Sequence, residues 1–166
     1  MLEPLNQSNI DATASSPAVS PLTKIFASAL YTGFSPVASG TAGSLIGLLI
    51  YFLPSFEKTF VILPLSFIVL VLGAFAAKKM ETAYGPDPRQ VTIDEVLGMW
   101  ISLLFLQKTI MIAVLTFIIF RIMDIIKPWP ARFFDKRSGG WSIMLDDVVA
   151  GIYTNLLLQI CLFFFT

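Results

Sequence analysis

An uncharged run of 18 residues, from Phe60 to Ala77, limits the folds that are open to this chain. A helix needs about 20 mostly apolar residues to cross the hydrocarbon core of a bilayer, so this run predicts a membrane-spanning helix in spite of Pro64. Of the 166 residues, 56% are hydrophobic and only 13% are charged, whereas soluble domains carry about 25% charged residues. We therefore expect a compact, all-α, multi-pass membrane protein.

Four further apolar segments have the length of helices. With the first run they predict five core helices, at about residues 42–56, 60–77, 91–106, 109–127 and 142–165. The first and third of these have about 15 residues and reach only ~22 Å at 1.5 Å per residue. Because the hydrocarbon core is ~30 Å thick, we expect them to cross a thinned region, tilt little or enter only partway.

The N-terminal part of the chain has a different character. Residues 1–20 are rich in Ser, Asn, Ala and Pro, and predict a flexible tail that precedes a single helical domain over residues 21–166. Apolar residues recur at helical spacing from Leu22 to Leu30. They indicate a helix that lies along the bilayer surface, although packing on the protein's own core is equally compatible.

The composition excludes several kinds of enzyme. The chain has no histidine, which rules out serine–histidine hydrolases, histidine phosphotransfer and histidine-built zinc sites. Its single cysteine, Cys161, lies in an apolar run, so neither a disulfide framework nor a cysteine phosphatase is expected. The net charge is zero, which gives no reason to expect a nucleic-acid partner.

The charged residues fall on one side of the predicted membrane. If the five helices alternate across the bilayer, nine of the eleven cations and ten of the eleven acidic residues share one side, and the positive-inside rule makes that side cytoplasmic. Asp94 with Glu95, Asp124 with Lys127, and Asp146 with Asp147 then reach the same depth. The alternation predicts an active site facing the cytoplasm from the inner membrane.

Residues 121–151 hold four aspartates and five cations between two apolar runs. Arg121 and Asp124 are three residues apart, so they share one face of an otherwise apolar helix. Asp146 and Asp147 are adjacent, and adjacent carboxylates repel each other unless a cation neutralises them. Ionisable residues within apolar helices are costly and usually functional, and a hard divalent cation such as Mg²⁺ prefers these oxygen ligands.

A small ion transporter with paired charges remains an alternative, although its charges would gather at one end only.

Clustered carboxylates beside lysine and arginine suggest Mg²⁺-dependent hydrolysis of a phosphate ester, and the position at a membrane interface suggests a lipid headgroup as substrate. A glycine-rich turn at residues 40–44 precedes a predicted helix and could bind phosphate through backbone N–H groups. The same turn is also compatible with a plain helix-starting loop.

Four segments carry a resemblance to a known family: GTAGSL at residues 40–45, IDEVLGMW at 93–100, FRIMDIIKPWPARFFD at 120–135 and GGWSIMLDDVVAG at 139–151. In this order they resemble the signature blocks of phosphatidylglycerophosphatase A. The resemblance implies a small helical membrane phosphatase that uses Mg²⁺ to convert phosphatidylglycerophosphate to phosphatidylglycerol in phospholipid biosynthesis. The CDP-alcohol phosphatidyltransferases also use aspartates and Mg²⁺, but their motif, in which an aspartate precedes a glycine, is absent.

The resemblance also implies a set of site residues. The functional positions are expected to be Asp94, Glu95, Asp124, Lys127, Asp135, Asp146 and Asp147. Within this set we expect the metal ligands to be Glu95, Asp146 and Asp147 first, with Asp94 and Asp124 next. Phosphate is expected to be bound by Gly40, Thr41, Gly43, Ser44, Lys127 and Arg132.

Overall fold

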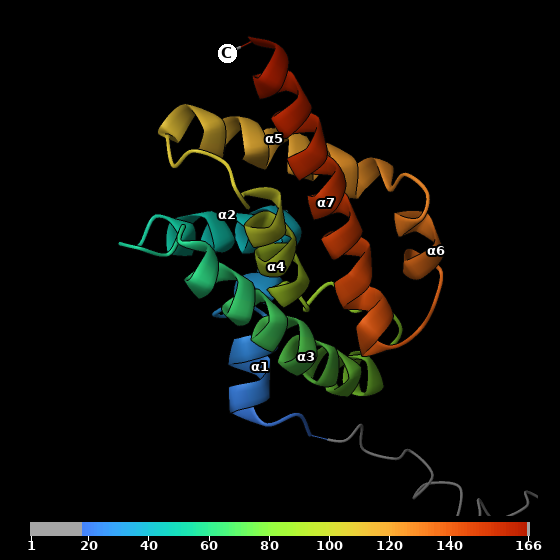
Figure 1. Ribbon diagram of the computed structural model, residues 1–166. Coiled ribbons are helices and arrows are strands. Elements are labelled where there is room, and N and C mark those ends of the chain that lie inside the picture. Colours follow the sequence, from blue (N-terminus) through green and yellow to red (C-terminus); the bar gives the residue numbers. More distant parts are fainter. Residues whose placement is uncertain (1–17, 166) are drawn as a thin grey trace, which may run out of the picture.

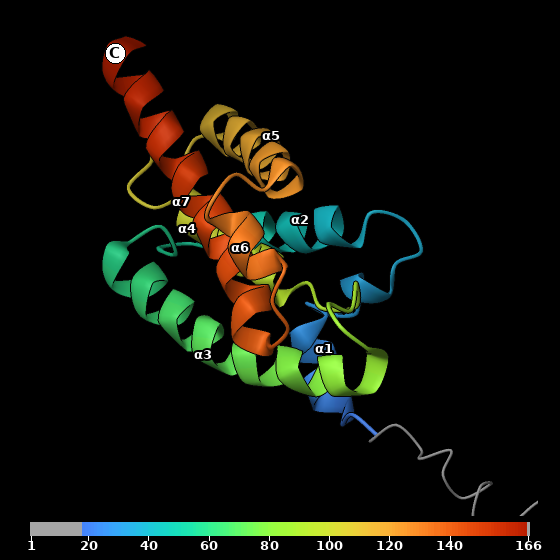
Figure 2. The ribbon, with the colours of Figure 1, turned by 90° about the vertical axis from the view of Figure 1, so that its right-hand side faces the viewer.

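The computed structural model describes residues 18–165, which contain helices and no strand (Figures 1 and 2). The prediction of an all-α fold is confirmed for this part of the chain, whereas residues 1–17 of the predicted tail lie outside it. In chain order the elements are α1 (Pro21–Ala27), the 3₁₀ helix η2 (Thr32–Phe34), α2 (Ser39–Tyr51), α3 (Thr59–Tyr84), α4 (Ile93–Ser102), α5 (Ile110–Ile126), α6 (Ala131–Asp135) and α7 (Gly140–Phe165).

Helix α3 is longer than its apolar run predicts. It continues past Ala77 to Tyr84, and Glu81 is buried near its end. The Glu81 carboxylate accepts a hydrogen bond of 2.7 Å from Lys78 and one of 2.9 Å from the Gly139 backbone N–H. The polar end of α3 is thereby tied to the segment that leads into α7.

Helix α4 is shorter than predicted and ends at Ser102. The apolar sequence continues to Leu106 without a helix breaker, so periodicity could not predict this end. The buried Asn155 of α7 donates hydrogen bonds to the carbonyl groups of Ser102 at 3.0 Å and Leu104 at 2.7 Å. A side chain on a distant helix therefore satisfies carbonyl groups that a longer α4 would have satisfied itself.

Helix α4 lies at the centre of the molecule, where it contacts α2, α3, α5 and α7 (Figure 1). Its backbone is close to that of α7, because a Cβ on Gly151 would lie only 2.6 Å from the Gly98 carbonyl oxygen. A Cβ on Gly98 would lie 2.9 Å from the Asp147 carbonyl oxygen and 2.5 Å from the Phe120 ring. Glycine at this crossing brings the aspartates of α7 beside the start of α4.

Two helices, α3 and α7, are long and apolar enough to cross a membrane. Helices α2 and α5 have 13 and 17 residues, and α4 has 10. At 1.5 Å per residue α4 spans ~15 Å, about half of a hydrocarbon core.

The charged ends of the helices gather at one end of the molecule. In Figure 2, α2 begins on the right, α3 and α5 run towards the right, and α7 rises from the lower middle to its C-terminal end at the upper left. The connection from α5 to α7, which lies between two of the predicted helices, contains the short helix α6. Helix α6 packs against α7 at this same end.

Candidate active site

A cleft of about 530 Å³ opens at the charged end of the molecule. Its walls come from the segment that begins α2, the loop between α3 and α4, the first turn of α4, the end of α5 and the first turns of α7. Six carboxylates and three cations line it: Asp87, Asp94, Glu95, Asp124, Asp146, Asp147, Arg89, Arg121 and Lys127.

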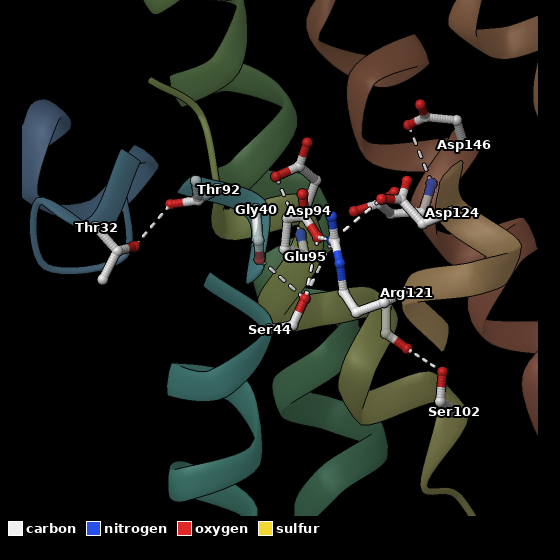
Figure 3. Close-up of polar contacts among 12 residues, drawn as sticks. Thr32, Gly40, Ser44, Thr92, Asp94, Glu95, Ser102, Arg121, Asp124 and Asp146 are labelled. Atoms are coloured by element: carbon white, nitrogen blue, oxygen red, sulfur yellow. Dashed lines mark hydrogen bonds and ion pairs between the residues drawn. The ribbon is translucent and has the colours of Figure 1, made fainter. Parts of the chain in front are cut away.

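Arg121 joins three of the elements around the cleft. From α5, its guanidinium forms an ion pair with Glu95 of α4 and another, at 3.1 Å, with Asp124. It also donates a hydrogen bond of 3.3 Å to the Ser44 hydroxyl of α2, as Figure 3 shows. The charged side chains of Arg121, Glu95 and Asp124 are each less than a fifth exposed. Because a buried ion needs partners to offset its desolvation, this cluster defines how α2, α4 and α5 meet.

Lys127 forms a second bridge, between α5 and α7. It caps α5 in a left-handed backbone conformation with φ of 48°. Its ammonium group donates to Asp146 at 2.8 Å and to Asp135 of α6. Burial alone would lower the pKa of Lys127, but Asp146 and Asp135 outweigh burial and raise that pKa above its ordinary value. Lys127 is therefore a permanent cation at the edge of the cleft.

Asp147 has an oxygen without a hydrogen-bond partner. Its side chain is buried, and within the described residues its Oδ2 atom accepts no hydrogen bond. The neighbouring Asp146 accepts one of 3.0 Å from the Asp147 backbone N–H. A buried carboxylate oxygen left unsatisfied is costly, unless it binds a cation.

The acidic groups at the start of α4 point to the same need for a cation. Asp94 and Glu95 lie outside the two helices that are long enough to span a membrane. Burial raises the pKa of Glu95 to about 7, with Asp124 adding to the rise and Arg121 opposing it. Burial also raises the pKa of Asp94 well above its ordinary range, and the charge of Glu95 adds to this. The cations of the cleft thus leave part of its negative charge uncompensated.

These oxygen donors fit a hard divalent cation, although they do not surround one as they stand. Within residues 18–165, no three acidic side chains are close enough together to form a ready-made metal site. Arg121 and Lys127 lie between the carboxylates and occupy part of their coordinating capacity. Among the fully buried side-chain atoms of residues 18–165 that lack a hydrogen-bond partner, Asp147 Oδ2 is the one carboxylate oxygen.

Gly40 places the start of α2 against this cluster. A Cβ on Gly40 would lie 2.1 Å from Glu95 Oε1 and 3.0 Å from the Arg121 guanidinium, so no other residue fits without moving the ion pair. Ser44 is one turn further on, and its hydroxyl lies 3.0 Å from the Gly40 carbonyl oxygen and 3.1 Å from Glu95. In Figure 3 both residues face Glu95 and Arg121.

Of the predicted phosphate-binding residues at the start of α2, one lines the cleft and the others do not. Gly40 lines the cleft, but Thr41 is exposed and does not line it. Gly43 and Ser44 are buried behind the cleft, where Gly43 packs closely on Thr92. The predicted metal ligands, in contrast, all line the cleft.

Arg132 and Asp135 also lie outside the cleft. Arg132 lines a neighbouring pocket, and Asp135 acts on the cleft only through its ion pair with Lys127. Through this ion pair Asp135 orients Lys127.

Three charged residues that line the cleft are missing from the predicted set: Arg121, Arg89 and Asp87. The position of Arg121 in an apolar helix, three residues before Asp124, was a signal that could have included it. Arg89 and Asp87 belong to a turn-rich loop, in which charged residues are ordinary. Their sequence context therefore carried no signal, and only the fold brings that loop to the cleft.

Comparison with known proteins identifies relatives over most of the chain. Residues 25–162 match the family described as Phosphatidylglycerophosphatase A. A Bacteroides thetaiotaomicron protein with the name "Putative phosphatidylinositol-3-phosphatase" is 37% identical over 78% of this chain and 86% of its own. The Phosphatidylglycerophosphatase A proteins of Escherichia coli and Haemophilus influenzae are 36% and 33% identical.

These last two alignments cover 73% and 74% of this chain, and 72% and 77% of the respective relatives. No solved structure matches the chain.

Proposed function

The chain belongs to the phosphatidylglycerophosphatase A family, and on this premise we propose that it hydrolyses phosphatidylglycerophosphate to phosphatidylglycerol and phosphate, with Mg²⁺ as its cofactor. The reaction would be a step in phospholipid biosynthesis at the cytoplasmic face of the inner membrane. The two long apolar helices and the collection of charges at one end of the molecule support a membrane location.

One observation carries the Mg²⁺ proposal: six carboxylates face three cations in a single cleft. An anionic phosphate ester would be repelled from such a cleft unless a cation entered with it. Glu95, Asp146 and Asp147 are the proposed ligands, with Asp94 and Asp124 beside them. When bound, Mg²⁺ supplies positive charge to the phosphate oxygens and lowers the pKa of water.

The protein's own cations have separate tasks in this proposal. Arg121 is already neutralised by Glu95 and Asp124, so it orients these carboxylates rather than binding phosphate alone. Arg89 forms no ion pair among the described residues and lines the cleft, so its guanidinium can receive the phosphate oxygens. Lys127 holds Asp146 in place and presents a fixed charge at the cleft edge.

In the reaction, the oxygen of a water molecule bonds to phosphorus while the bond from phosphorus to the terminal glycerol oxygen breaks. That glycerol oxygen gains a proton and leaves as the hydroxyl of phosphatidylglycerol. A buried carboxylate beside the cleft can accept the proton that the water loses.

A second substrate follows from the Bacteroides relative, whose name refers to phosphatidylinositol 3-phosphate. The family match and the names of the other two relatives favour phosphatidylglycerophosphate. Family membership also counts against the phosphatidyltransferase and transporter alternatives.

The test is release of phosphate by the purified protein from four substrates, each with and without Mg²⁺. These are phosphatidylglycerophosphate, phosphatidylinositol 3-phosphate, phosphatidic acid and glycerol 3-phosphate. We expect Mg²⁺-dependent release from phosphatidylglycerophosphate above all. Preference for the inositol lipid would instead support the second substrate, and release from none of the four would contradict a lipid phosphatase.

Asp147→Asn should lower kcat about a hundredfold or more, because it removes a charge from the oxygen set proposed to hold the metal. The matched control is Glu57→Gln, which changes a carboxylate paired with Lys108 outside the cleft. Full activity in Asp147→Asn would refute the proposed metal site.

A further inference from the structure

A second pocket, of about 500 Å³, lies beside the catalytic cleft and shares Lys127 with it. The walls of this second pocket come from the end of α5 and from α6. Three cations line it, Lys127, Arg132 and Lys136, together with the aromatic rings of Trp129 and Phe133. None of the described side chains that line it is acidic, so its charge is opposite to that of the cleft.

Two of these cations are available to a ligand. Arg132 and Lys136 are exposed and form no ion pair within residues 18–165, whereas Lys127 is held by Asp135 and Asp146. Trp129 is 79% exposed at the rim. An exposed tryptophan beside free cations is typical of a surface at the level of lipid headgroups.

The chemistry of the proposed substrate matches this pair of pockets. A phosphatidylglycerophosphate headgroup carries two phosphates: a terminal monoester, which is hydrolysed, and a diester, which joins the glycerol to the lipid. A single glycerol unit separates them. The cleft and the second pocket likewise meet at a single residue, Lys127.

We propose that the second pocket binds the phosphodiester of the lipid headgroup through Arg132 and Lys136, while the cleft receives the terminal monoester. This inference rests on the proposed function, which it extends from the reaction to substrate selection. Lys127, at the junction, places a positive charge between the two phosphates.

The proposal defines a class of substrates. A lipid is selected when its headgroup has a phosphodiester followed by a polyol that carries a monoester. Phosphatidylglycerophosphate and phosphatidylinositol 3-phosphate both satisfy this rule. Phosphatidic acid has the monoester alone, so it gains nothing from the second pocket.

The first experiment measures KM and kcat for phosphatidylglycerophosphate in uncharged detergent micelles, where only the substrate supplies surface charge. The double variant Arg132→Gln/Lys136→Gln should raise KM about tenfold or more and leave kcat within about twofold, since charge-assisted hydrogen bonds to the diester are lost away from the reacting atoms. Lys79→Gln is the matched control, because Lys79 is an exposed cation that lines neither pocket.

The second experiment measures inhibition by the two products, each of which corresponds to one of the two phosphates of the substrate. Phosphatidylglycerol retains the diester, and inorganic phosphate mimics the monoester. The double variant should weaken inhibition by phosphatidylglycerol about tenfold and leave inhibition by inorganic phosphate unchanged. Arg89→Gln should weaken inhibition by inorganic phosphate and leave inhibition by phosphatidylglycerol unchanged.

Three outcomes would overturn the inference while leaving the proposed function intact. They are an unchanged KM in the double variant, an equal loss of inhibition by both products, and an absence of inhibition by phosphatidylglycerol in the wild type. An inactive wild type would instead count against the proposed function itself, so the two failures are distinguishable.

Discussion

Arg121 shows how a single side chain organises the cleft at the charged end of the molecule. Its guanidinium contacts Ser44, Glu95 and Asp124, which belong to three different helices. A planar group with five donors can serve several acceptors at once, whereas a lysine ammonium acts as a point charge. The residue therefore contributes both charge and geometry.

We predict that Arg121→Lys retains most of the stability but lowers kcat about a hundredfold, because Glu95 and Asp124 lose their common orientation. Arg121→Gln should also destabilise the fold by about 3–5 kcal/mol, since it leaves buried carboxylates without their cation. Phosphate release and thermal unfolding in detergent measure the two effects.

Arg137→Lys is the control, because Arg137 is exposed and stacks only on Phe133, at 3.9 Å. Wild-type activity in Arg121→Lys would show that positive charge alone is sufficient at this position.

Among the elements, α4 depends most on its neighbours. Its 10 residues include Val96, Leu97 and Met99, which are almost completely buried between the other helices. A helix this short is marginal by itself, so tertiary packing must stabilise it. The hydrogen bonds from Asn155 of α7 satisfy carbonyl groups at its C-terminal end.

Asn155→Leu should lower the free energy of unfolding by about 1–3 kcal/mol, because it leaves one buried and one partly buried carbonyl group without donors. Gln159→Leu is the matched control, since Gln159 is exposed and donates only to the Asn155 side chain. Thermal unfolding in detergent gives the comparison. Equal stability of the two variants would show that water or lipid replaces the Asn155 hydrogen bonds.

At the scale of the whole molecule, the site lies at one end and the two long apolar helices extend from it. Lys58 precedes α3 and Lys136 follows α6, so the five-helix alternation puts them on opposite sides of a membrane. Lys58 and Lys136 therefore report on whether α3, which is long and apolar enough to cross a membrane, does cross it.

We expect Lys58→Cys and Lys136→Cys, each in a background with Cys161→Ser, to be labelled from opposite sides of sealed vesicles by a membrane-impermeant thiol reagent. Lys136→Cys should react from the cytoplasmic side. Labelling after detergent solubilisation shows that both thiols are reactive, and both reacting from one side would refute the alternation.

Much of the fold could be predicted from local patterns. Apolar runs located the five core helices, and the proline residues after Lys127 ended α5 where expected. The end of α3 was wrong because the helix continues through the charged residues that follow the apolar run, until Gly85 caps it. The end of α4 was wrong because Asn155 of the distant helix α7 satisfies its carbonyl groups. Helix α6 was missed because its five residues are too few for a periodic pattern.

The sequence by itself determined which residue types were available for chemistry: carboxylates, lysines and arginines without histidine, at the same ends of apolar helices. Composition and helical periodicity carry this information because both are properties of the chain alone. Only the tertiary structure decided how these groups are used. It neutralises Arg121 and Lys127, brings Arg89 to the cleft and assigns Arg132 to a second pocket. Periodicity defines the face of a helix, but packing determines which neighbour that face meets.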